Sequence, residues 1–277
     1  MGLIEYTCAV MLTSALAGLL GALTGLGGGV VIVPVLALIF HVDLRYAVGA
    51  SLISVIATSS GAAVSYVREG FSNVRIGMFL EVATTLGAVA GAYLAARIST
   101  HSIGIIFGIT LLYSAWSSFR NKQDVPSHPP NALAEKLKLT GDYPVGAGRR
   151  TYIAQNVPAG FGIMAIAGIL SGLLGIGSGA VKVLAMDSAM KLPFKVSTTT
   201  SNFMIGVTAA ASAGIYLTRG YIQPGLAMPV MLGVLAGSIL GARQLIGAQV
   251  RVLRWIFAGV VGVMAIEMIV TGVKGKL

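Results

Sequence analysis

Two clusters of glycine are the residues whose types and spacing most clearly suggest chemistry. They are Gly25–Gly29 and Gly175–Gly179, 150 positions apart, and each precedes an apolar run of only eleven residues. A run of glycines interrupts a helix, and the short helix after it begins with unpaired backbone N–H groups and the positive end of its dipole. Both breaks therefore predict a site for a small anion. The expected backbone donors are Gly27, Gly28, Gly29, Gly177, Ser178 and Gly179.

Lys182 adds a positive charge to the second cluster. It stands three residues after Gly179, in the first turn of the predicted short helix, whereas the matching position of the first cluster is Ile32. A lysine at the centre of a bilayer costs about 2.5–3.5 kcal/mol on insertion scales, so it normally faces a cavity or a partner. We favour contact with an anionic substrate. The alternative is a structural lysine that pairs with Asp187 or with backbone carbonyls.

A stripe of small polar residues follows each short run, on the next predicted helix. Hydroxyl and amide groups can bind an oxyanion. Ser and Thr hydroxyls also bond to their own helix, so a packing role explains the stripe equally well. The candidate ligands on these helices are Thr58, Ser201, Asn202 and Thr208.

Three acidic residues lie in or near apolar segments. Glu81 is about a third of the way into such a segment and is the candidate proton relay, since intramembrane acids often mark relays. Asp187 and Glu267 are expected nearer the membrane interface. The three histidines lack the spacing of metal ligands, and no nucleophile–base pair is evident. We therefore expect no metal, no cofactor and no enzymatic activity.

The composition indicates that the helices carrying these candidate residues lie in a membrane. The chain has 277 residues, of which 56% are hydrophobic and 10% charged, against about 25% charged in soluble domains. So few charges cannot cover a surface in water, which excludes a soluble globular enzyme. Most apolar runs reach the roughly 20 residues that span a bilayer as a helix. The runs are 4–24, 30–40, 46–67, 74–96, 102–119, 153–174, 180–190, 196–217, 222–246 and 253–272.

The two sets of runs repeat at a fixed offset of 150. Between 18–92 and 168–242, 17 of 75 positions are identical without a gap. The repeat includes both glycine clusters and both eleven-residue runs. Other glycines are spaced four residues apart: Gly87 with Gly91, and Gly233 with Gly237 and Gly241. We expect these only to let helices approach closely. The clusters differ from them because a run too short to span the bilayer follows each.

Each half contains three spanning runs and one glycine-broken pair. Whether that pair turns back or crosses, a half crosses an odd number of times, so the second half enters from the opposite face. We therefore predict an all-α polytopic membrane protein of two inverted-topology repeats, each a glycine-broken helical hairpin plus three spanning helices. The predicted divisions are 1–119 for the first repeat, 120–152 for a linker and 153–277 for the second. Within the linker, 131–139 could form a short interfacial helix.

Charge bias supports this topology. Thirteen Lys and Arg residues fall on the linker side and five on the side of the termini. Because cytoplasmic loops carry the excess of positive charge, we expect a cytoplasmic linker and both termini outside. The net charge of +10 is scattered between apolar runs, so nucleic acid is not an expected partner. The lipid bilayer and a small anion are; the oligomeric state is not predicted.

Several motifs resemble the TauE/SafE family of sulfite exporters. In the first half they are 25–34, 40–45 and 49–52, and in the second half 175–182 and 200–208. The resemblance covers nearly the whole chain except the linker. It implies a multi-span transporter of two inverted halves that exports sulfite or small organosulfonates without an organic cofactor. Ser178 and Leu184 depart from the family pattern, which has glycine and proline there.

Together these features predict a secondary transporter that exports small sulfur-containing anions across the inner membrane. Two alternatives remain at this stage. A cation carrier or channel would use intramembrane acids such as Glu81. A non-transporting membrane scaffold would use its glycines only for packing, and an anion would not stabilise it.

Overall fold

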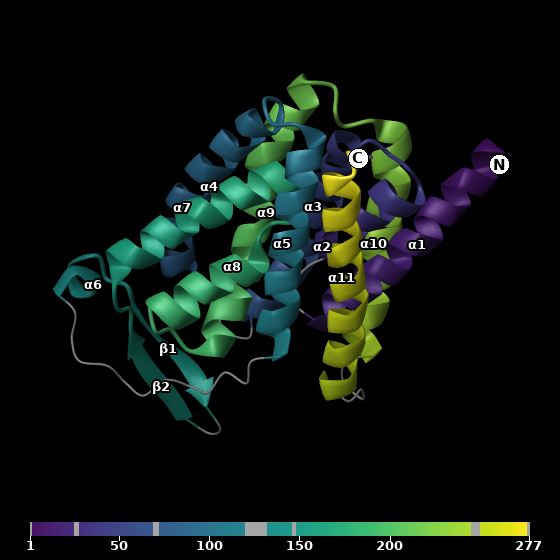
Figure 1. Cartoon of the computed structure of the whole chain (residues 1–277). Helices are drawn as coiled ribbons and strands as arrows, with labels where there is room; N and C mark the ends of the chain where they lie inside the picture. Colours follow the sequence, from purple (N-terminus) through teal and green to yellow (C-terminus); the bar gives the residue numbers. More distant parts are fainter. Residues whose placement is uncertain are drawn as a thin grey trace.

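The computed structural model describes residues 2–24, 28–68, 72–119, 132–145, 148–244 and 250–275. It is predominantly helical, as predicted for an all-α membrane protein (Figure 1). The first half comprises α1 (Leu3–Thr24), α2 (Gly29–Pro34), the π-helix η1 (Val35–Ile39), α3 (Leu44–Arg68), α4 (Val74–Ala95) and α5 (Thr100–Phe119). The second half comprises α7 (Val157–Leu174), α8 (Gly179–Leu184), the π-helix η2 (Ala185–Ala189), α9 (Phe194–Thr218), α10 (Pro224–Gln244) and α11 (Val250–Val273). Between the halves lie α6 (Ala132–Lys136), β1 (Thr140–Val145) and β2 (Gly148–Ile153).

The helix bounds follow the 150-residue offset of the sequence. The elements α2, η1 and α3 recur at that offset as α8, η2 and α9, with the same lengths. Even the π-helical turns recur, so the local irregularity after each short helix belongs to the repeat. The two halves thus have the same order of elements.

Each glycine-broken segment folds back toward the side on which it starts. In the second half, the backbone N–H of Gln155, just before α7, donates to the carbonyl of Met190, just after η2, over 2.9 Å. In the first half, the ring of Tyr6 near the start of α1 contacts that of Phe40 after η1, with centroids 5.6 Å apart. Both segments are therefore hairpins.

Glycines set the closest contacts between the halves. A Cβ on Gly87 would overlap the carbonyl oxygen of Ala165, and one on Gly91 would overlap that of Ile169. The contact advances by four residues along both helices, so α4 and α7 run in the same direction. The predicted packing role of these glycines is confirmed.

Glycines of α10, in the second half, pack in the same way against α1 of the first half. A Cβ on Gly237 would overlap the carbonyl of Ala15, and one on Gly233 that of Met11, so α1 and α10 also run in the same direction. In α5 and α11 the order reverses, because Gly108 faces Ala265 while Gly272 faces His101.

The described helices present apolar side chains outward. Leu86, Ile109, Ile166 and Val263 are more than half exposed, as suits a lipid-facing surface. By length and composition, three described helices could cross a membrane: they span Ile4–Gly21, Val74–Ala95 and Val157–Leu174. The ends of the chain lie at one end of the bundle, and the β-hairpin lies toward the other (Figure 1).

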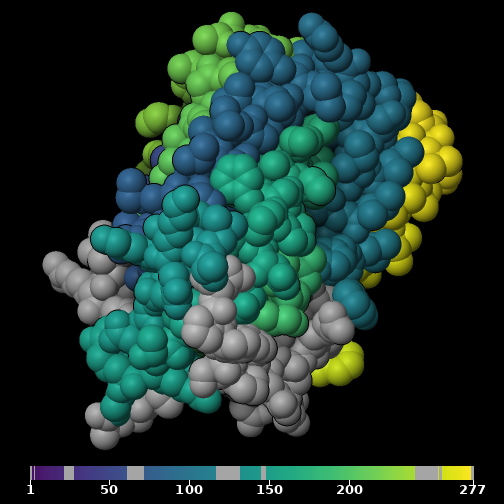
Figure 2. All heavy atoms as spheres, turned by 90° about the vertical axis from the view of Figure 1, so that its left-hand side faces the viewer, coloured from purple at the N-terminus to yellow at the C-terminus, as the bar shows by residue number. Residues whose placement is uncertain are grey.

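The linker departs from the all-helical prediction. Its helix covers only Ala132–Lys136, and β1 and β2 pair antiparallel from Thr140 opposite Ile153 to Val145 opposite Gly148. Tyr143 and Tyr152 are buried against the ends of α4 and η2, with residues such as Ile76 and Met190. The sequence carried the signal, since β-branched and aromatic residues flank a glycine-containing turn. We call residues 132–145 and 148–153 the linker module; Figure 2 shows it in teal beside α7 and α4.

Candidate functional site

A lysine, a threonine and a glutamate meet in the interior of the bundle. The Nζ atom of Lys182 on α8 donates to Oγ1 of Thr208 on α9 over 2.5 Å. That hydroxyl lies 2.6 Å from Oε1 of Glu81 on α4 and donates to it. Lys182 and Thr208 have no exposed surface, and Glu81 is 8% exposed. We call these three residues the charged triad.

The second glycine break places Lys182 at this depth. Gly175 and Gly177 both have a φ of +68°, and Ser178 follows at +48°, so the chain leaves α7 through left-handed conformations. These positions favour glycine because a Cβ strains such a backbone. The first turn of α8 then begins, and the N–H of Lys182 bonds to the carbonyl of Ser178 over 3.0 Å. The break thereby directs the lysine toward α9.

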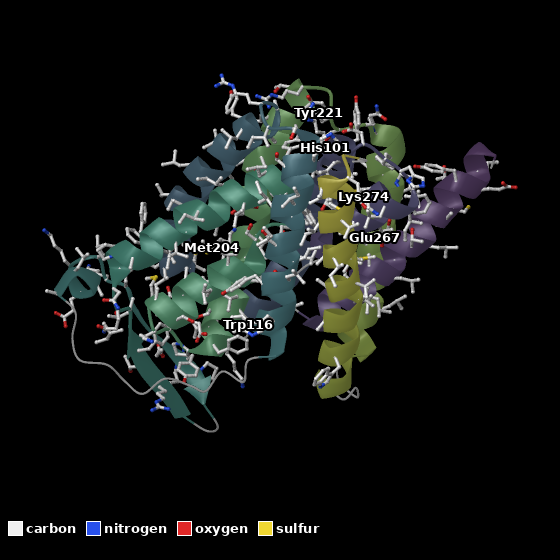
Figure 3. The ribbon with its side chains drawn as sticks, in the orientation of Figure 1. His101, Trp116, Met204, Tyr221, Glu267 and Lys274 are labelled. Atoms are coloured by element: carbon white, nitrogen blue, oxygen red, sulfur yellow. The ribbon has the colours of Figure 1, made fainter. Side chains whose placement is uncertain are left out.

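The parallel packing of α4 and α9 brings Glu81 to the triad. Three polar contacts join the two helices, and in each the residues are 127 positions apart: Asn73 with Thr200, Glu81 with Thr208, and Ala92 with Arg219. The helices thus keep one register along their length. Figure 3 shows Met204, one turn before Thr208, inside this part of the bundle, with Tyr221 and His101 toward its far end.

The triad leaves hydrogen-bonding capacity unused. Thr85 also donates to Oε1 of Glu81, over 3.1 Å, but Oε2 of Glu81 is buried without a partner among the described residues. The hydroxyl of Ser178 is likewise buried without a partner among the described residues. The ammonium group of Lys182 has three protons to donate. Among the described residues, Thr208 is the one acceptor that its side chain has. The triad therefore has free donors and a free acceptor.

The predicted site residues on the stripe lie in different surroundings. Ser201 is buried and donates to the carbonyl of Gly179 over 3.3 Å, and Thr208 is in the triad. Thr58 is half-buried, and its hydroxyl bonds to the carbonyls of Ser54 and Val55 on its own helix. Asn202 is half-buried on α9. The structure brings Ser201 and Thr208 to α8, whereas Thr58 makes the local contacts typical of a packed hydroxyl.

The two glycine breaks meet through a serine. Gly29 starts α2, and a Cβ there would lie 2.8 Å from Oγ of Ser51 and 3.2 Å from the carbonyl of Gly175. Ser51 donates to that same carbonyl over 2.8 Å. Gly28 is the buried N-cap of α2, and Gly27 lies outside the described residues. Ser51 was not among the predicted site residues, although it belongs to the polar stripe.

The triad joins the two repeats, because Glu81 belongs to the first half whereas Lys182 and Thr208 belong to the second. The set of positions related to it by the 150-residue offset lacks both charges. At the equivalent positions, 150 residues away, stand Ile32 for Lys182, Thr58 for Thr208 and Met231 for Glu81. The threonine is common to both halves, but both charges are replaced by apolar side chains. The two halves thus have similar helices, but the described residues contain one such pair of buried charges and not two.

Asn73 joins the linker module to the triad helices and was not predicted. Its side-chain oxygen accepts from the N–H of Ile76 and caps α4, and its backbone N–H donates to Thr200 on α9. Its Nδ2 donates to the hydroxyl of Tyr152 over 2.8 Å. An asparagine directly before an apolar helical run is a recognisable cap signal; its other contacts depend on the tertiary fold.

A helical bundle with apolar outer faces, two glycine-broken hairpins and a buried lysine fits a membrane transporter. The chain belongs to the sulfite exporter TauE/SafE family, whose model matches residues 10–268. This confirms the resemblance predicted from the motifs.

Curated relatives agree with this class. The chain is 28% identical over 234 residues to the probable membrane transporter protein YunE of Bacillus subtilis, covering 82% of this chain and 84% of that one. It is 26% identical over 235 residues to the probable membrane transporter protein YdhB of the same organism, covering 84% and 88%. The probable membrane transporter protein MJ0441 of Methanocaldococcus jannaschii is 23% identical over 275 residues, covering 94% of each chain. No solved structure matches. These are membrane transporters and not enzymes, as predicted.

Proposed function

We propose that this protein is a secondary transporter that exports small sulfur-containing anions, such as sulfite or an organosulfonate, across the inner membrane. The observation that carries the proposal is Lys182, a fully buried lysine directly after a glycine break, with ammonium protons to spare among the described residues. A charge at this depth is costly to keep unless it serves a pathway or a partner. The family name is consistent with a sulfur oxyanion.

The proposed ligands combine charge with neutral donors. Lys182 supplies the charge, and Thr208 and Ser178 supply hydroxyls close to it. Ser201, Asn202 and Thr58 are further ligands, which would turn toward the anion on a change of conformation. The remaining donors are backbone N–H groups of Gly27, Gly28, Gly29, Gly177 and Gly179 at the two breaks.

Alternating access by two inverted repeats, 1–119 and 153–277, is the proposed transport mechanism. Its support is the directions of the helices. The α4 helix runs parallel to α7 and α1 runs parallel to α10, while α5 and α11 run antiparallel. Since α3 and α4 are joined by a short connection, as are α9 and α10, these directions favour opposite orientations for corresponding elements.

The proposed orientation places the linker, 120–152, in the cytoplasm and both termini outside. Its support is the bias of Lys and Arg, thirteen against five. Trp116 near the end of α5 and Trp255 near the start of α11 are both exposed, and Trp116 lies toward the linker end of the bundle (Figure 3). Exposed tryptophans of this kind mark a membrane interface.

A cation carrier is the less favoured function. It would need a carboxylate that is free to coordinate the cation. Glu81, which is buried, instead shares the hydroxyl of Thr208 with Lys182. That positive charge opposes binding of a cation.

The test compares purified wild type with Lys182→Met and, as a matched control, with Lys274→Met at the exposed end of α11. Sulfite is expected to raise the unfolding temperature of the wild type and the control above the value in chloride at equal ionic strength. Lys182→Met should lose this rise, and its proteoliposomes should lose sulfite flux. Wild-type protein without stabilisation or flux for sulfite and for simple sulfonates would overturn the proposal.

A further inference from the structure

The charged triad has a charge balance that restricts how an anion can enter. Lys182 and Glu81 share one threonine hydroxyl, so each ion is the other's counter-charge through a single bridge. Both groups are nearly or fully buried. With Glu81 ionised, an anion arriving at Lys182 would place two negative charges against one positive charge. In an interior of low dielectric constant, such an excess charge is strongly disfavoured.

Resting on the proposed function, we infer that the site binds a proton together with each anion. The proton goes to Oε2 of Glu81, the oxygen that has no partner among the described residues. The neutral carboxyl then ceases to be the counter-charge of Lys182, and the anion takes that role. The net charge of the triad is zero before the exchange and zero after it.

Among the described side chains of the surrounding helices, no other charged group is placed to take this role. The α7 helix carries no titratable residue, and α8 carries only Lys182. Asp187 is buried on η2, five residues beyond Lys182, and it has an interaction of its own. The other described titratable side chains on neighbouring helices are Arg75 and Tyr93 on α4, His101 and Tyr113 on α5, Arg45 and Tyr46 on α3, and Lys195 and Tyr216 on α9. The basic residues among them all lie in the first turn of their helix: Arg75, His101, Arg45 and Lys195.

The same balance selects the charge of the substrate. One proton and one monovalent anion leave the triad neutral, whereas a divalent anion leaves an excess negative charge. The inferred substrate class is therefore monoanions, such as an organosulfonate or hydrogen sulfite, in preference to sulfite dianion or sulfate. Transport of a monoanion would then move no net charge.

Methanesulfonate is the probe that separates protonation of the protein from that of the substrate, because it remains a monoanion across the working pH range. If one proton is bound with each anion, its apparent affinity for the purified wild type should fall with rising pH, by up to about tenfold per pH unit. Glu81→Gln keeps a hydrogen-bonding side chain of the same shape and should bind methanesulfonate without this pH dependence. Glu267→Gln, the same change on an exposed acid of α11, should behave as wild type.

Proteoliposomes give a measurement that needs no variant. Methanesulfonate flux through the wild type should carry one proton per anion and should not change when the membrane voltage is clamped at different values. Sulfate should be transported at least tenfold more slowly. Methanesulfonate flux without proton movement, or a pH dependence that Glu81→Gln retains, would overturn the inference but leave anion transport standing. If the wild type neither binds nor transports methanesulfonate or hydrogen sulfite, both the inference and the proposed function are overturned.

Discussion

Asn73 donates its backbone N–H to the hydroxyl of Thr200 over 3.0 Å, 127 positions further along the chain. Glu81 and Thr208 have the same separation, two turns further along both helices. A residue at the edge of the linker module is thus in register with the charged triad. Movement of α4 against α9 at one end must therefore shift the contact between Glu81 and Thr208.

Replacing Asn73 tests this junction. Asn73→Ala should lose the cap of α4 and the contact with Tyr152, and a lost cap alone costs about 1 kcal/mol. Asn73→Asp keeps the capping oxygen and loses only the Nδ2 donor, so it should retain more of the stability. Thermal unfolding in detergent measures the difference. Equal unfolding temperatures for the two variants would show that the cap is not the stabilising contact.

Tyr152 gives the linker module a defined response to alkaline pH. Burial raises the pKa of Tyr152 to about 12, with a smaller contribution from Asp142, and the hydrogen bond from Asn73 acts in the opposite direction. An unfolded tyrosine has a pKa of about 10. Because the folded pKa is the higher one, the stabilising contribution is complete below about pH 10 and is lost as the pH rises through about 12.

Absorbance of tyrosinate during a pH titration measures this behaviour. Subtracting the titration of Tyr152→Phe from that of the wild type should isolate one late-titrating tyrosine. If the missing tyrosine titrates near pH 10, its ring is not buried against the bundle.

The two charges of the triad should depend on each other for stability. Lys182→Met alone leaves Glu81 buried without its cation, and breaking a buried pair in this way costs about 3–5 kcal/mol. The double variant Lys182→Met with Glu81→Gln removes both charges and should recover most of that loss. Unfolding of the two single variants and the double variant gives the coupling free energy. Additive losses would mean that the residues do not interact.

A pair of glycines in facing helices distinguishes close packing from helix propensity. Gly87→Ala places a methyl group against the backbone of α7 and should destabilise the protein by about 1–3 kcal/mol. Gly162→Ala, on α7, meets nothing within 4 Å and should be neutral or stabilising by up to about 1 kcal/mol. Unfolding temperatures compared side by side provide the measurement.

The single cysteine of the chain makes the orientation accessible to labelling. In a Cys8→Ala background, Gly2→Cys should react with a membrane-impermeant maleimide on intact cells. Lys136→Cys, in the linker module, should react only after the cells are opened. The reverse pattern would place the linker outside and contradict the proposed orientation.

The helices were largely predictable because hydrophobic length and glycine position are local signals. The predicted runs 30–40 and 180–190 match α2–η1 and α8–η2 within one residue at each end. The repeat offset predicted the equal lengths of α3 and α9. The β-hairpin was missed because a search for long apolar runs does not detect short strands in a polar linker, although their β-branched and aromatic residues were a usable signal.

The site was predicted as a set of residues and not as a geometry. Lys182 and Glu81 were identified by the cost of a charged group in a membrane, and Thr208 was identified as a hydroxyl ligand on the polar stripe. Their connection depends on α4 and α9 lying parallel in one register, which no local pattern encodes. Asn73 and Ser51 were missed for the same reason, since their partners lie 127 and 124 positions away.

The glycine contacts also bear on how the chain is made. The surface of α1 that carries Ala15 and Gly18 is complementary to α10, which begins at Pro224. During synthesis, about two hundred residues must therefore be added after α1 before α10 is available for this contact, and α4 likewise contacts a helix, α7, that is made later. Each half therefore completes its closest helix contacts with the other half, and the contact of α1 with α10 can form only after most of the chain has been synthesised.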